Sequence, residues 1–113
     1  MKRLIALLVA VAAVAAVAVA VTVPALAATK TVKVGPKINF GPKRLSIKRG
    51  TIVKFAWTGG LPHNVRISKG PQKGTISKVK TKGTASRRFT KAGTYTIVCD
   101  VHAPTMKMTI RVS

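Results

Sequence analysis

The chain has 113 residues, of which 47% are hydrophobic, and its 21 lysines and arginines face one acidic residue, for a net charge of +20. Its one cysteine cannot form an internal disulfide, which excludes the disulfide-stapled class of small exported domains. An enzyme is not expected, because there is one acidic residue, no second metal motif and no nucleophile paired with a base, as covalent catalysis requires.

Residues 1–27 have the three parts of a secretory signal peptide. Two basic residues are followed by an apolar run of 20 residues (4–23) and then by Ala25 and Ala27, which occupy positions −3 and −1 of an A-x-A cleavage site. The run is also long enough to span a bilayer as an uncleaved anchor. We favour cleavage after Ala27, because the A-x-A site follows the run at the right place.

Export is expected in either case, because the N-terminal charges keep that end in the cytoplasm. Residues 28–113 would then be periplasmic, at the cell surface or secreted, or at the outer face of the cytoplasmic membrane if the first segment is retained. These residues suffice for one small domain. Without Lys2 and Arg3, 19 basic residues remain against one acid, a net charge of about +18.

Such a charge favours anionic partners. An anionic polymer of the cell envelope, a membrane surface or an acidic protein fits an exported domain better than nucleic acid. A solvated basic surface with no partner stays open as an alternative.

From residue 29 onward the pattern predicts short strands separated by Gly and Pro turns, without helical periodicity. Alternating apolar residues predict strands at 31–34, 44–48, 53–58, 63–68, 84–90, 95–99 and 107–112. The polar, lysine-rich stretch 71–82 is expected to be a loop with one weak strand near 75–80. Seven or eight short strands predict an all-β fold, an antiparallel Greek-key β-sandwich.

Strand parity places several chemically active side chains at one end of this sandwich. His63 begins a strand and shares the core-facing side of Val65 and Ile67, whereas Cys99 ends a strand. Met106 leads into the last strand. Strand ends and the loop between them can therefore converge, as in many sites built on a rigid scaffold.

Cys99, His102, Met106 and Met108 lie within ten residues, and His63 follows a Gly-Gly-Leu-Pro turn. Taken singly, the cysteine is as readily a buried core residue as a ligand, and His63 and the two methionines are more often ordinary loop or core residues. Together, a thiolate, two imidazoles and a thioether are the ligands of a mononuclear blue copper site. Zinc could use the three stronger ligands, but a thioether adds little for zinc and no paired CxxC is present.

The runs Pro-His-Asn-Val at 62–65 and Cys-x2-His-x3-Met at 99–106 resemble those of the cupredoxins, the blue copper proteins, most closely the plastocyanin and amicyanin type. The resemblance covers almost all of residues 28–113. It implies a cupredoxin-like sandwich with one type 1 copper ion, whose equatorial ligands are His63, Cys99 and His102 and whose axial ligand is Met106.

The resemblance also implies roles around the ligands. Asn64 would tie the strand of the first ligand to the cysteine loop. His102 would lie near the surface in an apolar patch that passes electrons, and the residues that could supply this patch are Leu61, Pro62, Ala103 and Pro104.

Three features depart from the family. Asp100, the only acid, follows the cysteine where relatives often have Ser or Thr. It can accept a hydrogen bond from Asn64, but an anion near the metal should favour Cu(II), unless one of the many lysines pairs with it. Three residues separate His102 from Met106, so the ligand loop is of intermediate length among relatives. Met108 is an alternative axial ligand. Met106 is preferred because its run into the last strand resembles that of the family.

Three functions remain in competition. The first is a one-electron carrier that docks, as a monomer, to a redox partner protein with an acidic surface. The second is copper storage, delivery or resistance with the same residues. The third is a cationic envelope-binding sandwich in which the cysteine and histidines are incidental.

Overall fold

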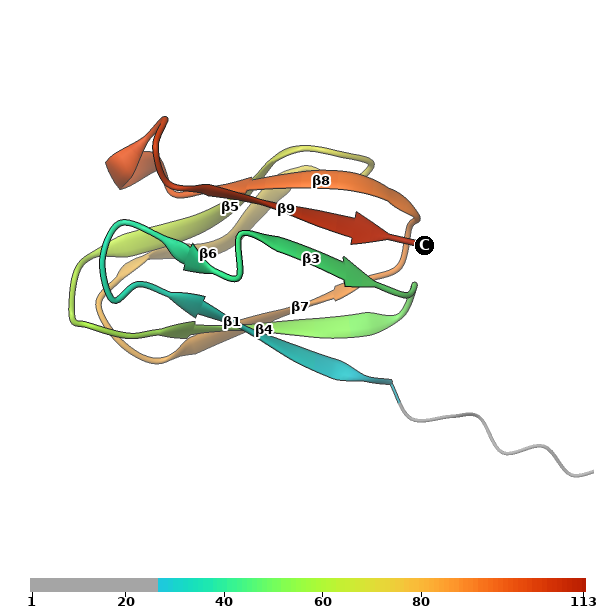
Figure 1. Cartoon of the computed structure of the whole chain (residues 1–113), viewed down its shortest axis with the longest axis horizontal. Helices are drawn as coiled ribbons and strands as arrows, with labels where there is room; N and C mark the ends of the chain where they lie inside the picture. Colours follow the sequence, from blue (N-terminus) through green and yellow to red (C-terminus); the bar gives the residue numbers. More distant parts are fainter. Residues whose placement is uncertain (1–26) are drawn as a thin grey trace, which may run out of the picture.

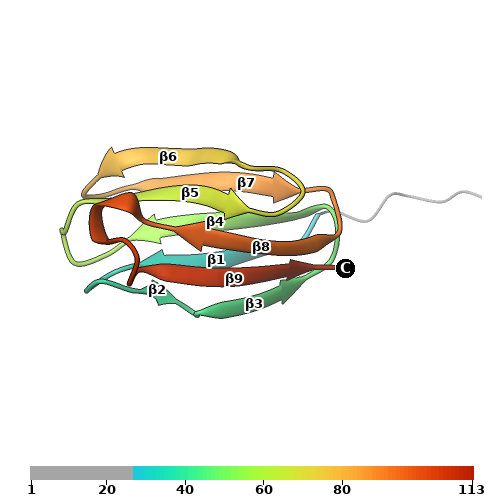
Figure 2. The ribbon, with the colours of Figure 1, turned by 90° about the horizontal axis from the view of Figure 1, so that it is seen from above.

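A computed structural model describes residues 27–113, which form two packed β-sheets (Figures 1 and 2). The predicted signal peptide, apart from Ala27, lies outside the described residues. Within 27–113, no helix has the length and apolar character needed to cross a membrane.

The strands follow one another along the chain with short connections. They are β1 (Thr29–Val34), β2 (Phe40–Gly41), β3 (Arg44–Ile47), β4 (Thr51–Trp57), β5 (His63–Lys69), β6 (Gly74–Lys80), β7 (Thr84–Phe89), β8 (Gly93–Val98) and β9 (Lys107–Val112). A 3-10 turn, η1 (Asp100–His102), follows β8. One sheet has the order β2-β1-β4-β7 and the other the order β3-β9-β8-β5-β6.

The prediction of an all-β Greek-key sandwich is confirmed, although the two-residue strand β2 was not predicted and two further details differ. The pairs β1–β4 and β3–β9 are parallel, whereas the remaining pairs are antiparallel. Gly74–Lys80 is a full strand where we expected a loop with a weak strand. Because β6 is an edge strand that pairs only with β5 in its sheet, its side chains are half-buried or exposed and show no apolar alternation.

The core follows from the two-residue period of the strands. In β4, the side chains of Val53, Phe55 and Trp57 are buried, while Lys54 between them is exposed. The same alternation buries Tyr95 and Ile97 in β8 and the even-numbered residues of β9. The space between the sheets is thus filled by aliphatic and aromatic side chains.

Two loops pack against each other at one end of the sandwich. Gly35 and Gly59 have φ of 102° and 85°, and a Cβ at either position would clash with the carbonyl of Thr58 or with Pro36. The backbone N–H of Thr58 donates to the carbonyl of Val34 at 2.9 Å. This close approach fixes the chain just before β5. The turn η1 lies at the same end of the sandwich, opposite the C-terminus (Figure 2).

Candidate metal centre

Three predicted ligands come together at this end of the sandwich. The ligand atoms of His63, Cys99 and His102 all lie within 4.8 Å of one another. His63 is the first residue of β5, Cys99 directly follows β8, and His102 is the last residue of η1. The structure therefore brings the three together through the start of β5, the end of β8 and the turn η1, and the expected convergence of strand ends and loop is present.

His63 and Cys99 form the buried part of the cluster, since both side chains are 0% exposed. Nδ1 of His63 lies 3.8 Å from Sγ of Cys99. Burial lowers the pKa of His63, and the nearby His102 lowers it further, which favours the neutral imidazole that a metal requires. The backbone of Lys37 acts in the opposite direction and raises the pKa of His63. Among the described residues, none lies within hydrogen-bonding distance and angle of His63 Nε2.

His102 is the half-buried member of the cluster. Its ring lies edge-on to that of His63, with centroids 4.9 Å apart and planes at 61°. Its Nε2 is 3.2 Å from the carbonyl oxygen of Pro62. If Nε2 carries the proton and donates it to this carbonyl, Nδ1 is left with a free lone pair for a metal.

Met106 and Met108 are both buried, with 1% and 2% of their surface exposed, but they belong to different surroundings. The backbone of Met106 accepts a hydrogen bond from the N–H of Cys99 at 3.1 Å and donates one to the carbonyl of His102 at 3.2 Å. Met108 lies inside β9, opposite Ile97 of β8. Met106 is thus tied to two residues of the cluster, while Met108 is part of the sheet.

Asn64 connects β5 to the cysteine loop by two hydrogen bonds, one that it donates and one that it accepts. Its Nδ2 donates to Oδ2 of Asp100 at 2.7 Å, and its Oδ1 accepts the backbone N–H of Asp100 at 2.7 Å. The expected hydrogen bond between these two side chains is present.

The ionic partner of Asp100 is Arg66, whereas we expected a lysine. Arg66 Nη2 lies 2.7 Å from Oδ1 of Asp100. Its guanidinium and then Asn64 hold the pKa of Asp100 down at about 2. Parity places Arg66 on the same side of β5 as Asn64, but it does not distinguish Arg66 from the many other basic residues of the chain.

Exposed apolar side chains lie next to His102 in the chain and beside Pro62, whose carbonyl His102 contacts. Leu61 and Val101 are 40% and 46% exposed, and the side chains of Pro62, Ala103 and Pro104 are exposed as well. Val101 was not among the predicted members of this patch, although it directly precedes the histidine. Of the three ligands, only His102 is partly exposed, and exposed apolar residues flank it and Pro62 along the chain.

The donor set fits a soft or borderline transition metal. The Sγ–Nδ1 distance of 3.8 Å allows only a weak hydrogen bond to sulfur. It is close to the separation of two ligands of one ion, given metal–nitrogen and metal–sulfur distances of about 2.0–2.3 Å. Thiolate and imidazole ligands suit copper in both of its oxidation states.

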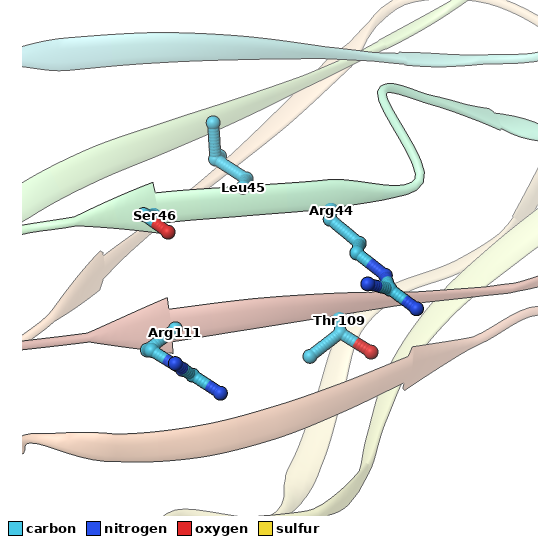
Figure 3. Close-up of a pocket in the computed structure, with 5 residues that line it drawn as sticks. All are labelled: Arg44, Leu45, Ser46, Thr109 and Arg111. Atoms are coloured by element: carbon cyan, nitrogen blue, oxygen red, sulfur yellow. The ribbon is translucent and has the colours of Figure 1, made fainter.

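A surface depression of about 420 Å³ lies elsewhere, on the outer side of β3 and β9 (Figure 3). Its described lining consists of Arg44, Leu45, Ser46, Thr109 and Arg111. None of the predicted ligands is among them. The metal centre is thus a compact cluster among packed side chains and does not occupy this hollow.

The family model described as copper binding proteins, plastocyanin/azurin family, matches residues 27–113. Amicyanin-alpha of Methylorubrum extorquens is 35% identical over 86 residues, which cover 74% of this chain and 71% of that protein. Plastocyanin of Ulva prolifera is 34% identical over 83 residues, covering 65% of this chain and 85% of that protein.

Solved structures agree with this likeness. Amicyanin from Paracoccus versutus matches with a TM-score of 0.65 and 29% identity, over 80% of this chain and 85% of that chain. A Cu(I) structure of a mutant amicyanin matches with a TM-score of 0.63 and 26% identity, over 81% and 97% of the two chains. The cluster of His63, Cys99 and His102 lies within the region matched by the family model, so copper is the cofactor it is suited to hold. The chain belongs to the plastocyanin/azurin family of copper binding proteins.

Proposed function

We propose that this protein is an exported one-electron carrier in which His63, Cys99, His102 and Met106 hold one type 1 copper ion, with Met106 as the axial ligand. The observation that carries the proposal is the convergence of one thiol and two imidazoles within 4.8 Å. Bound copper supplies a one-electron Cu(I)/Cu(II) couple at this site.

The surroundings of the ligands suit electron transfer without bond chemistry. His63 and Cys99 are held by strands of a packed core, and the backbone of Met106 is hydrogen-bonded to the backbone of both Cys99 and His102. Ligands held in this way keep their positions when the charge of the site changes. The family to which the chain belongs supports a carrier rather than an enzyme.

Electrons would enter and leave through His102, the half-buried imidazole within the apolar patch of Leu61, Pro62, Val101, Ala103 and Pro104. The partner would be a redox protein with an acidic docking surface, because the chain carries 21 basic residues and one acid. An anionic envelope polymer or membrane surface is a further partner for the same charge, and we expect a monomer.

Titration with Cu(II) tests the proposal. The purified protein should develop an intense visible absorption from thiolate-to-copper charge transfer, and Cys99→Ser should abolish it. Ile97→Val, a conservative change at an equally buried position of β8, should keep the band. A colourless protein that binds no copper would exclude a blue copper site.

Electron self-exchange separates a carrier from a copper-handling protein. Fast and reversible exchange between the oxidised and reduced forms is expected. Rapid transfer of copper to chelators, together with slow self-exchange, would instead favour storage or delivery.

A further inference from the structure

Asp100 has the only acidic side chain of the sequence, and it directly follows the thiol of the cluster. Its carboxylate accepts hydrogen bonds from two residues of β5 and leaves neither oxygen without a partner. Asn64 Nδ2 donates to Oδ2 at 2.7 Å. Arg66 Nη2 donates to Oδ1 at 2.7 Å, and Arg66 Nε donates to Oδ2 at 3.0 Å.

The guanidinium of Arg66 thus binds the carboxylate in a bidentate way, through the donors Nε and Nη2. This fork geometry is specific to arginine, since lysine offers a point charge on a flexible stem. The backbone N–H of Asp100 adds a further bond in the opposite direction, to Oδ1 of Asn64 at 2.7 Å. These bonds join one short strand segment to the first residue of η1.

The strand that supplies these donors also supplies His63. β5 begins with His63, whose Nδ1 faces Sγ of Cys99 at 3.8 Å. Asn64 and Arg66 lie on the opposite face of the same strand and hold the residue after Cys99. The carboxylate bonds therefore connect the imidazole and the thiol by a second route, outside the core.

The same contact also sets the charge beside the cluster. An isolated carboxylate one residue from a thiolate would favour the more oxidised metal ion. With the guanidinium at 2.7 Å, the carboxylate and its partner are together neutral. Removal of Arg66 would leave this anion without the one guanidinium that contacts it among the described residues.

We propose that Arg66 is a positioning residue of the copper site: through Asp100 it fixes the Cys99 loop against β5 and cancels the one negative charge next to the thiolate. This inference rests on the proposed copper site. Arg66 is therefore expected to affect the potential of the site more than the stability of the fold.

An ordinary surface ion pair is the alternative. The two side chains are 40% and 46% exposed, and exposed pairs of this kind contribute little to stability. An ion pair without a role at the site would change neither the potential of the copper nor the motion of the cysteine loop. Those two quantities discriminate between the alternatives.

The midpoint potential of the copper-loaded protein is the first test, in the variants Arg66→Gln, Asp100→Asn and the double variant. Arg66→Gln should lower the potential and Asp100→Asn should raise it, while the double variant should fall between them. The control Arg88→Gln removes an equal charge from the exposed outer face of β7 and should lower the potential less than Arg66→Gln does. Equal effects of Arg66→Gln and Arg88→Gln would overturn the electrostatic role.

Hydrogen exchange in the copper-free protein is the second test, and it does not depend on copper binding. The amide of Asp100 should exchange roughly fivefold to tenfold faster in Arg66→Gln, as expected when a hydrogen-bonded loop loses support. Arg66→Lys, which keeps the charge and loses the fork, should also speed exchange while shifting the potential less. Unchanged exchange in both variants would overturn the positioning role, whereas a wild-type protein without a thiolate band would overturn the copper site itself.

Discussion

Met106 and Met108 have the same side chain and nearly the same burial, so only their neighbours distinguish them as axial ligands. The backbone of Met106 is hydrogen-bonded to that of Cys99 and His102, whereas Met108 of β9 lies opposite Ile97 of β8 in the sheet. A weak axial thioether helps to set the potential of a blue copper site. The two methionines should therefore respond differently to the same substitution.

Met106→Leu should raise the midpoint potential, because loss of a weak donor removes stabilisation from Cu(II) more than from Cu(I). Met108→Leu conserves volume in the core and should cost less than about 1.5 kcal/mol of stability with little change in potential. Voltammetry and thermal unfolding of the two variants provide the measurements. A shift in potential with Met108→Leu alone would make Met108 the axial ligand.

At the scale of single residues, the sequence was most informative about the few residues whose side chains can bind a soft metal ion. His63, Cys99 and His102 could be predicted to meet because soft ligands are few, because His63 and Cys99 belong to strand ends, and because His102 is in the loop that follows Cys99. Arg66 could not be identified as the partner of Asp100, since many basic side chains share the outward faces. Parity names the face of a side chain, but it does not say which cation reaches a given carboxylate.

At the scale of elements, alternation predicted the strands that have one buried face. β4, β8 and β9 follow the two-residue period closely. The edge strand β6 and the two-residue β2 gave no such signal. The parallel pairs β1–β4 and β3–β9 could not be predicted from local pattern, because the neighbour of a strand within its sheet depends on how the whole chain crosses between the two sheets.

Tyr95 anchors β8 to the turn that precedes it. Its hydroxyl donates to the carbonyl of Lys91 at 2.7 Å, and its ring packs edge-on against Phe89 with centroids 5.0 Å apart. Burial raises the pKa of Tyr95, although Arg87 acts in the opposite direction. The folded protein therefore holds the neutral phenol more strongly than the unfolded chain does.

This pKa shift predicts a dependence of stability on alkaline pH. Because the folded pKa lies above the unfolded value of about 10, the contribution of Tyr95 is complete below pH ~10 and is lost as the pH rises through the folded pKa. Tyr95→Phe should cost about 1 kcal/mol at pH 7 through the lost hydrogen bond. The difference from wild type should shrink at higher pH.

Urea unfolding of both proteins at pH 7 and pH 11 measures this difference. Lysines titrate in both chains, so only the gap between the two proteins reports on Tyr95. A gap that stays constant from neutral to alkaline pH would contradict a raised pKa for the phenol.

At the scale of the whole molecule, charge is the dominant feature. The one acid is already paired with Arg66, so the remaining lysines and arginines have no acidic side chain within the chain to pair with. Arg44 and Arg111 line the same depression on the outer side of β3 and β9 (Figure 3). Mutual repulsion of these charges should oppose folding at low ionic strength.

The melting temperature of the copper-free protein should therefore rise with salt, most steeply below about 0.15 M, where screening lengths exceed about 8 Å. A protein held mainly by exposed ion pairs would show the opposite trend.

The double variant Arg44→Gln/Arg111→Gln removes two like charges from one depression and should show a flatter dependence on salt. The control Arg66→Gln removes one charge and an ion pair together, and it should be less stable at low salt than the double variant. A melting temperature that falls as sodium chloride is added would show that self-repulsion is not what limits the stability of this domain.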